Sequence, residues 1–189
     1  MSLFTRIMAT PVALHGAATV AAFFGLGAVQ GRLDALYAQS NHPVDYATGQ
    51  TTFDAVQIKG FYAAMQGEGT LDVYVQTQQF DFLFLACMGL FGLLFGTFVA
   101  RFARNGSWGR KSGLFAAGLA VFGALCDATE NLISFVMLAD PQGFAAWLAL
   151  PYSGFAVVKF GAIALAMLAV LVAILLVAFG RATDRPTIA

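Results

Sequence analysis

The chain alternates between long apolar stretches and shorter polar connections. Four stretches run for about 20 residues or more, the length that a helix needs to cross a hydrocarbon core about 30 Å thick. They cover residues 11–29, 80–100, 113–138 and 151–179. We predict an all-α fold, a polytopic membrane protein whose four transmembrane helices form a bundle and a single domain.

The longest connection, residues 32–79, has an organisation of its own. Residues 38–50 are polar and rich in turn-forming side chains, so we expect a loop there. Residues 52–66 carry apolar positions at helical spacing, which are Phe53, Val56, Gly60, Phe61, Ala64 and Met65. This pattern predicts a short amphipathic helix that lies on the membrane surface or caps the bundle. A further helical pattern begins near Thr70 and continues into the second span.

Small residues recur every three or four positions in three of the spans. Such stripes let helix backbones approach closely, which is the main packing device in lipid. They comprise Ala9, Ala13, Ala17, Ala21 and Gly25; Gly89, Gly92, Gly96 and Ala100; and Ala116, Ala120, Gly123 and Ala124. At the start of the first span, Thr10 and Pro11 fit the N-cap and first position of a helix.

Composition supports assignment to the membrane class. Of 189 residues, 59% are hydrophobic and 11% are charged, against about 25% charged in a typical soluble domain. The formal net charge is zero, so no charge field suggests nucleic acid as a partner. Both cysteines, Cys87 and Cys126, fall in apolar spans, and we predict neither a metal site nor a cofactor.

The distribution of basic residues predicts the orientation. Basic side chains crowd the link between the second and third spans and flank the two ends of the chain: Arg6, Arg101, Arg104, Arg110, Lys111, Arg181 and Arg185. By the positive-inside rule, both termini are cytoplasmic and the acidic connection 32–79 is extracytoplasmic. The compact chain with short connections is typical of a bacterial inner membrane.

Three polar residues interrupt the third span. Asp127, Glu130 and Asn131 share one helical face, although charge in hydrocarbon costs roughly 3 kcal/mol or more per residue. Lys159 in the fourth span lies about 12 Å from its extracytoplasmic end, and so does Glu130 in the third. This matching depth predicts a Glu130–Lys159 ion pair, and we expect hydrogen bonds from Asn131 and Ser134 to complete the network.

The other polar positions leave alternatives open. Asp127 lies deeper, and it is protonated, shares Lys159, or faces a ligand or water. Asp81 joins the cluster from above, or it merely starts a helix at the interface. Tyr152 and Ser153, at the extracytoplasmic end of the fourth span, would line the opening to the same polar cluster. His15, in the first span, is interpreted as a hydrogen-bonded core residue.

The pattern Asp127-x-x-Glu130-Asn131-Leu132, together with Asp81 and Lys159, resembles one found in uncharacterised bacterial four-helix integral membrane proteins. The resemblance covers most of residues 53–175. It implies topology and no activity.

Three hypotheses follow for function. In the first, a lipid-like or small amphiphilic ligand binds in the outer half of the bundle for retention or transport. Its site comprises Asp127, Glu130, Asn131, Lys159, Asp81 and Ser134. Lys159 would bind an anionic group of the ligand, and Asp127 or Glu130 would accept a hydrogen bond from a donor group of the ligand.

In the second hypothesis the chain is an accessory subunit of a larger membrane complex, and the ion pairs only fix helix register. In the third it is a membrane enzyme with Asp127 as general acid or base on a lipidic substrate. The sequence does not decide whether the chain is an enzyme. The partners expected are the lipid bilayer, an amphiphile, and a second copy or a membrane-complex subunit, because four helices alone are too narrow for a conduction path.

Overall fold

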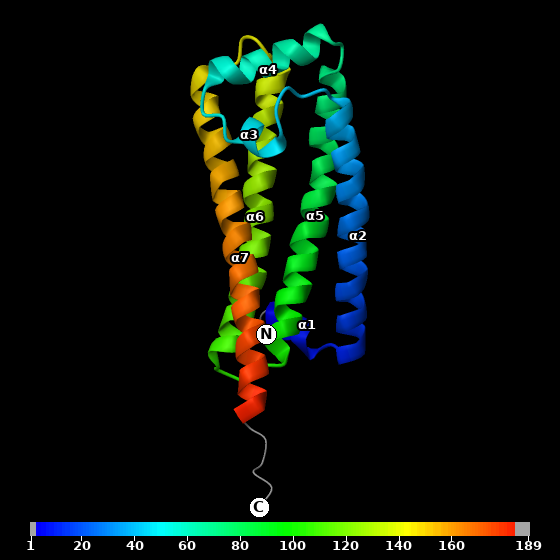
Figure 1. Ribbon diagram of the computed structural model, residues 1–189, viewed down its shortest axis with the longest axis vertical. Helices are drawn as coiled ribbons and strands as arrows, with labels where there is room; N and C mark the ends of the chain where they lie inside the picture. The colour runs from blue at the N-terminus through cyan, green and yellow to red at the C-terminus, as the bar shows by residue number, and fades with distance from the viewer. Residues whose placement is uncertain (1–2, 184–189) are drawn as a thin grey trace, which may run out of the picture.

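A computed structural model describes residues 3–183 and shows helices without any strand in that range (Figure 1). In chain order the elements are α1 (Leu3–Ala9), α2 (Val12–Gln39), α3 (Tyr46–Gln50), α4 (Ala55–Gly67), α5 (Leu71–Arg101), α6 (Trp108–Ala139), the 3-10 turn η1 (Ala146–Leu148) and α7 (Ala149–Thr183). Arg185, one of the basic residues that predict the orientation, lies outside the described residues.

Among the described helices, four are long and apolar enough to cross a membrane. They are α2, α5, α6, and α7 together with η1. The predicted all-α membrane bundle of four helices is therefore confirmed. The helices run beyond the predicted spans: α2 continues to Gln39, and α5 begins directly after Thr70, as expected.

The four long helices lie side by side in the order α2, α5, α6 and α7 (Figure 1). In the described part of the chain, α6 packs along both α5 and α7, whereas α2 packs mainly on α5. Contact between α5 and α7 is slight, so the bundle is a curved row and does not close into a square.

The small-residue stripes of the second and third spans form the α5–α6 contact. A Cβ atom on Gly96 would lie 2.7 Å from the carbonyl oxygen of Gly113 and 2.8 Å from the backbone nitrogen of Ala117. Such a close approach excludes any side chain. The backbones of α5 and α6 therefore meet here as the stripes predict.

The stripe predicted on the first span faces the other way. Ala13, Ala17, Ala21 and Gly25 are exposed, and the buried side of α2 carries His15 and Thr19. The rotation of α2 is set by His15, because a buried imidazole needs hydrogen-bond partners. These partners lie on α5. His15 Nε2 lies 3.0 Å from the Leu94 carbonyl oxygen.

His15 is thus the hydrogen-bonded core residue that the sequence predicts, with a partner that it does not reveal. Arg101 Nη1 donates to His15 Nδ1 at 3.0 Å, and Arg101 Nη2 donates to the Thr10 carbonyl at 2.9 Å. The prediction that Thr10 caps α2 is wrong. Its hydroxyl donates back to Ile7 in α1, and Pro11 occupies the N-cap position.

Residues 40–70, here called the cap, cover one end of the row. Within the cap, α4 lies across the ends of the long helices (Figure 1). Its buried side chains form a core with residues from α5, α6, α7 and the connection between α6 and η1: Ile58, Tyr62, Met65, Tyr74, Met137, Phe144 and Tyr152. The predicted amphipathic helix therefore caps the bundle, which is one of the two positions expected for it.

The predicted apolar face of α4 is right at Met65, which is buried, and in part at Phe61, which is half-buried against His42, but it is wrong at the other positions. Val56 is 77% exposed and Phe53 is 50% exposed. Tyr62 and Met65 set the rotation of α4, since their large side chains fill the space among the helix ends. Val56, Gly60 and Ala64 are left on the outer side.

The prediction that residues 38–50 are loop is also partly wrong. Asp45 caps a short helix, α3, by accepting hydrogen bonds from the backbone nitrogen and hydroxyl of Thr48, both at 2.9 Å. In Figure 1, α3 lies beneath α4, between α5 and α7. It places Gln50, which is buried, inside the row.

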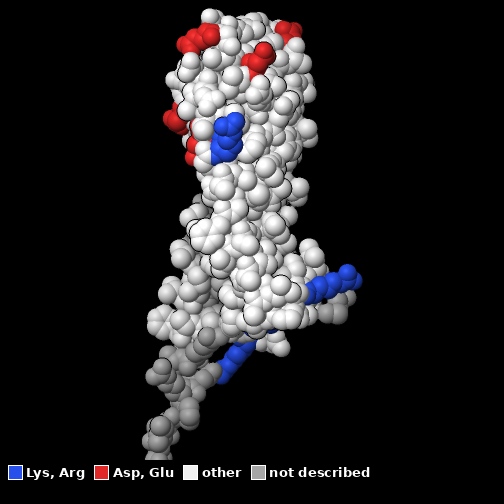
Figure 2. All heavy atoms as spheres, turned by 90° about the vertical axis from the view of Figure 1, so that its right-hand side faces the viewer, with Lys and Arg blue, Asp and Glu red and all other residues white. Residues whose placement is uncertain are grey.

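Charged side chains avoid the middle of the surface shown in Figure 2. Acidic groups gather at the cap end, and basic groups lie mostly toward the opposite end, with an uncharged band between them. Such a band suits a helix row immersed in hydrocarbon.

Gly96→Ala is expected to destabilise the fold, because its methyl group would overlap the backbone of α6. We expect the free energy of unfolding in detergent to fall by about 1–3 kcal/mol. The matched control is Gly161→Ala on α7, which has nothing within 4 Å of the added methyl group. Equal stability of the two variants in a denaturant titration would contradict the described packing.

Candidate functional site

The centre of the polar cluster is the ammonium group of Lys159 on α7. Its Nζ lies 2.7 Å from Asp127 Oδ1 and 2.6 Å from Glu130 Oε2. It also donates to Gln50 Oε1 of α3 at 3.0 Å. Of the three N–H groups of an ammonium, two donate to Asp127 and Gln50, and Glu130 lies at ion-pair distance. Lys159 is 3% exposed and Glu130 is fully buried.

The two long helices bring these groups together. Asp127 and Glu130 are three residues apart on α6 and therefore lie on one face. Gly123, one turn away, allows α7 to pass closely, since a Cβ there would lie 3.4 Å from Ile163 Cγ1. The equal depths estimated for Glu130 and Lys159 agree with their contact. Of the three alternatives for Asp127, the structure has the one in which it shares Lys159.

Asp81 on α5 is joined to the cluster through an amide. Asn131 Nδ2 donates to Asp81 Oδ2 at 2.5 Å, which agrees with the hydrogen bond expected from Asn131 and brings Asp81 into the network. Asp81 is 8% exposed and belongs to the buried set rather than to the interface. Gln78, one turn before Asp81 on α5, donates to the Tyr74 hydroxyl at 2.8 Å.

Above the ion pairs, toward α4, several buried polar atoms have no hydrogen-bond partner in the described part of the chain. They are both carboxylate oxygens of Glu130, Asn131 Oδ1, and the hydroxyl oxygens of Ser134, Ser153 and Tyr62. Of these, Glu130 Oε2 lies at ion-pair distance from Lys159. Ser134 is expected to complete the Glu130 network, but it lies near Tyr62 of α4 without a well-formed hydrogen bond. Each such atom costs about 1–3 kcal/mol relative to a paired one.

The charges in the cluster do not balance. The cluster holds three carboxyl groups and one ammonium group: Asp127 and Glu130 contact Lys159, and Asp81 is linked through Asn131. Buried charges are stable only when they are paired or neutralised. The cluster therefore favours protons or a cationic partner over an added anion. No group of three or more His, Cys, Asp or Glu residues that could hold a metal ion occurs among the described residues.

Gln50 is the cluster member that sequence reasoning misses. A single glutamine in a polar connection carries no periodic signal, and its partner Lys159 lies 109 positions away. The local signal is Asp45 with Thr48, which starts α3. The next residue, Gly49, packs so closely that an added Cβ would lie 2.9 Å from His42 Cε1.

His42 lies in an aromatic cluster that holds the cap on α5. Its ring centroid is 5.3 Å from that of Tyr37, and 5.2 Å from those of both Tyr74 and Phe61. Burial lowers the pKa of His42, and this outweighs the opposite effects of the Val44 carbonyl and the Asp45 carboxylate. The neutral imidazole is therefore the form that the cap stabilises.

Comparisons with protein-family models, with curated proteins and with solved structures gave no match to this chain. The class of protein follows from the fold: a multi-pass membrane protein with four apolar helices. A buried polar cluster joins three of these helices to the cap.

Gln50→Met should loosen the cap, because it removes the third acceptor of a buried ammonium. We expect a loss of about 1–3 kcal/mol in the stability of the region, seen as faster hydrogen exchange of α3 amides. The matched control is Gln57→Met on α4, where the side chain is exposed. The Gln50–Lys159 contact would be refuted by equal exchange rates in the two variants.

Acidification should destabilise the cap. An unfolded cap takes up a proton on His42 below pH about 6.5, the ordinary value, while the folded cap resists it because its pKa is lower. Stability is thus complete above this pH and falls as the pH drops below it, until the folded form is also protonated. Protection factors of cap amides, corrected for intrinsic exchange, should show this fall.

His42→Phe keeps an aromatic ring but has no titrating group, so its cap should lose this part of the pH dependence. An identical pH profile in the variant would assign the effect to another residue.

Proposed function

We propose that this protein binds a lipid-like or small amphiphilic molecule, with the polar headgroup in the cluster around Lys159 and Glu130. The observation that carries the proposal is the set of unpartnered polar atoms buried above the ion pairs. A purely structural network would be expected to satisfy its own members, since unpaired buried groups are costly. A bound headgroup with hydroxyl or amine groups would pair them.

The geometry favours the chemistry of one kind of headgroup. Lys159 already donates to Asp127 and Gln50 and forms an ion pair with Glu130. The unpartnered atoms include acceptors on Glu130 and Asn131, beside a surplus of carboxyl groups. A headgroup that is cationic or rich in hydrogen-bond donors suits this site better than the anion considered for Lys159.

We place the protein in a bacterial inner membrane with both termini cytoplasmic, so the cap covers the extracytoplasmic half. The basic residues around the ends of the chain support this orientation. The polar cluster lies close to the cap, and the opposite half of the row is mostly apolar apart from the buried contact of His15 with Arg101 and its polar neighbours. These features support binding, or exchange with one side of the membrane, more than conduction through a single copy.

One observation favours the second candidate, an accessory subunit of a membrane complex or a homo-oligomer. The small-residue face of α2 is exposed, and in the described chain α2 packs mainly on α5. Small residues mark helix contacts in lipid. Purification in mild detergent would support this candidate if it retained a stoichiometric partner, whereas a clean monomer would count against it.

Glu130→Gln tests the binding site while keeping the size of the side chain. It removes the carboxylate that pairs with Lys159 and faces the unpartnered hydroxyls, so a donor-rich ligand should bind at least about tenfold more weakly. The measurement is native mass spectrometry of the protein extracted from its own membrane, which reports any retained small molecule. The matched control is Glu68→Gln, an exposed residue at the end of α4.

Retention of the same molecule by wild type and by both variants would reject the cluster as its site. Wild-type protein that carries no small molecule, but does carry other proteins, would favour the subunit candidate.

A further inference from the structure

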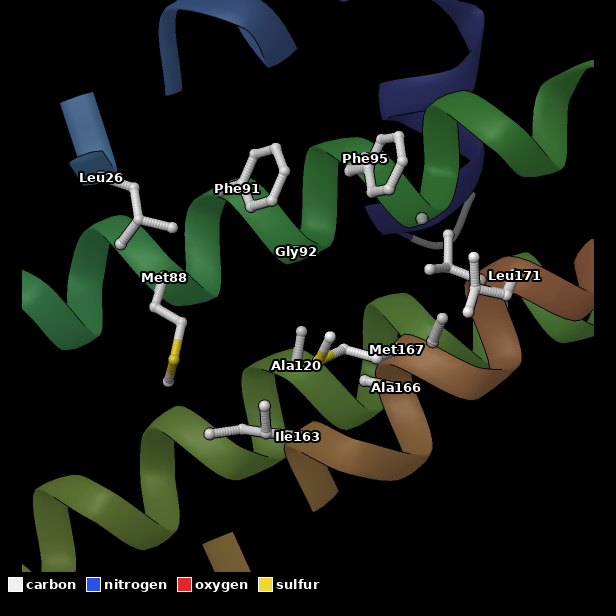
Figure 3. A pocket seen from close by; sticks show the side chains of 13 residues that line it. Leu26, Met88, Phe91, Gly92, Phe95, Ala120, Ile163, Ala166, Met167 and Leu171 are labelled. Atoms are coloured by element: carbon white, nitrogen blue, oxygen red, sulfur yellow. The ribbon is translucent and has the colours of Figure 1, made fainter. Parts of the chain in front are cut away.

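An apolar groove runs along the open side of the row, between α5 and α7. Its volume is about 410 Å³, within the range of about 300–1,000 Å³ that is usual for ligand pockets. Figure 3 shows Phe91 and Phe95 of α5 on one side, Met167 and Leu171 of α7 on the other, and Ala120 of α6 between them.

The groove exists because α6 packs closely on both α5 and α7, whereas α5 and α7 hardly contact each other. On α5, Gly92 and Gly96 approach α6 so closely that Ala120 lies against Gly92, which leaves no side chain to fill the space above. α7 packs on α6 and has only slight contact with α5. Small residues therefore form the floor, and larger apolar residues of α5 and α7 form the two walls.

The groove and the polar cluster occupy the same faces of three helices. On α7, Ile163 of the groove is one turn from Lys159. On α6 and α5 the groove residues Ala120 and Met88 are each seven positions from a cluster carboxyl, Asp127 and Asp81 respectively. Positions four and seven apart lie on one side of a helix. The groove thus begins about one helical turn from Lys159, on the side of the polar cluster away from the cap.

We infer that the groove holds the aliphatic chain of the ligand whose headgroup occupies the cluster, so that the ligand class is a single-chain amphiphile with a cationic or donor-rich head. This inference rests on the proposed function. Along α7 the groove extends from Ile163 to Leu171, about 12 Å at the helical rise, which suits an extended hydrocarbon chain. Met88 and Met167 are flexible side chains that adapt to such a chain.

The continuity with the cluster argues for this occupant over an unrelated bilayer lipid. A lipid that merely filled the groove would gain nothing from the polar groups one turn away. A tethered chain would align along three helix faces with its head beside the carboxyl groups of Asp127 and Glu130, where Glu130 Oε1 has no hydrogen-bond partner. Chain length and headgroup should then act together on affinity.

The test measures the binding of two radiolabelled amines, butylamine and tetradecylamine, to the full-length protein in nanodiscs. The variant Ala166→Phe fills the groove, since Ala166 lines it. Its matched control, Ala164→Phe, places the same ring on the exposed side of α7, outside the groove. We expect Ala166→Phe to weaken tetradecylamine binding about tenfold or more, with butylamine binding unchanged, and Ala164→Phe to alter neither.

Unchanged tetradecylamine binding in Ala166→Phe would overturn the groove assignment, as would wild-type protein that binds both amines equally well. A second measurement needs no variant: tetradecylamine with a diazirine at the end of its chain should crosslink to α5 and α7 residues of the groove, and crosslinking elsewhere would overturn it. Glu130→Gln separates the two proposals. If it leaves the binding of both amines unchanged, the headgroup site fails, whatever Ala166→Phe shows.

Discussion

The structure depends on the ammonium group of Lys159, which joins parts of the chain that the hydrophobic effect alone would not hold together. Asp127 and Glu130 fix α7 to α6, and Gln50 fixes the cap to α7. In lipid, apolar side chains give helices little reason to prefer one neighbour or one register over another. A buried charge with three acceptors supplies that preference, because any other register would leave it unpaired.

The hydrogen bond from Lys159 to Gln50 also explains why the cap covers the polar cluster. Gln50 reaches Lys159 only because α3 dips beneath α4, which in turn needs the Asp45 cap and the close packing of Gly49 on His42. The aromatic cluster around His42 then holds this segment on α5. Access to the unpartnered hydroxyls from the cap side therefore requires several contacts to break together, whereas the groove side of the row is open to the membrane.

The sequence pattern predicts features that are properties of a single helix, such as the position of a span and the depth of a residue within it. It located the four spans, and helical rise placed Glu130 and Lys159 at one depth, which agrees with their contact. It failed where a choice between faces depends on a partner elsewhere in the chain. The buried side of α2 is decided by the fit of His15 to α5, and that of α4 by Tyr62 and Met65 among the helix ends. Gln50 was missed for the same reason, since its partner is remote and its segment short.

Polar contacts at the two ends of the row and apolar contacts between them account for the groove. At the end opposite the cap, Arg101 holds α2 against α5 through His15 and the Thr10 carbonyl. At the cap end, Lys159 holds α7 against α6. Neither contact pulls α2 toward α7, so the row stays open along the side where α5 and α7 diverge. An apolar groove that begins one turn from an unbalanced polar cluster is the expected consequence, and amphiphiles are the molecules whose two ends match it.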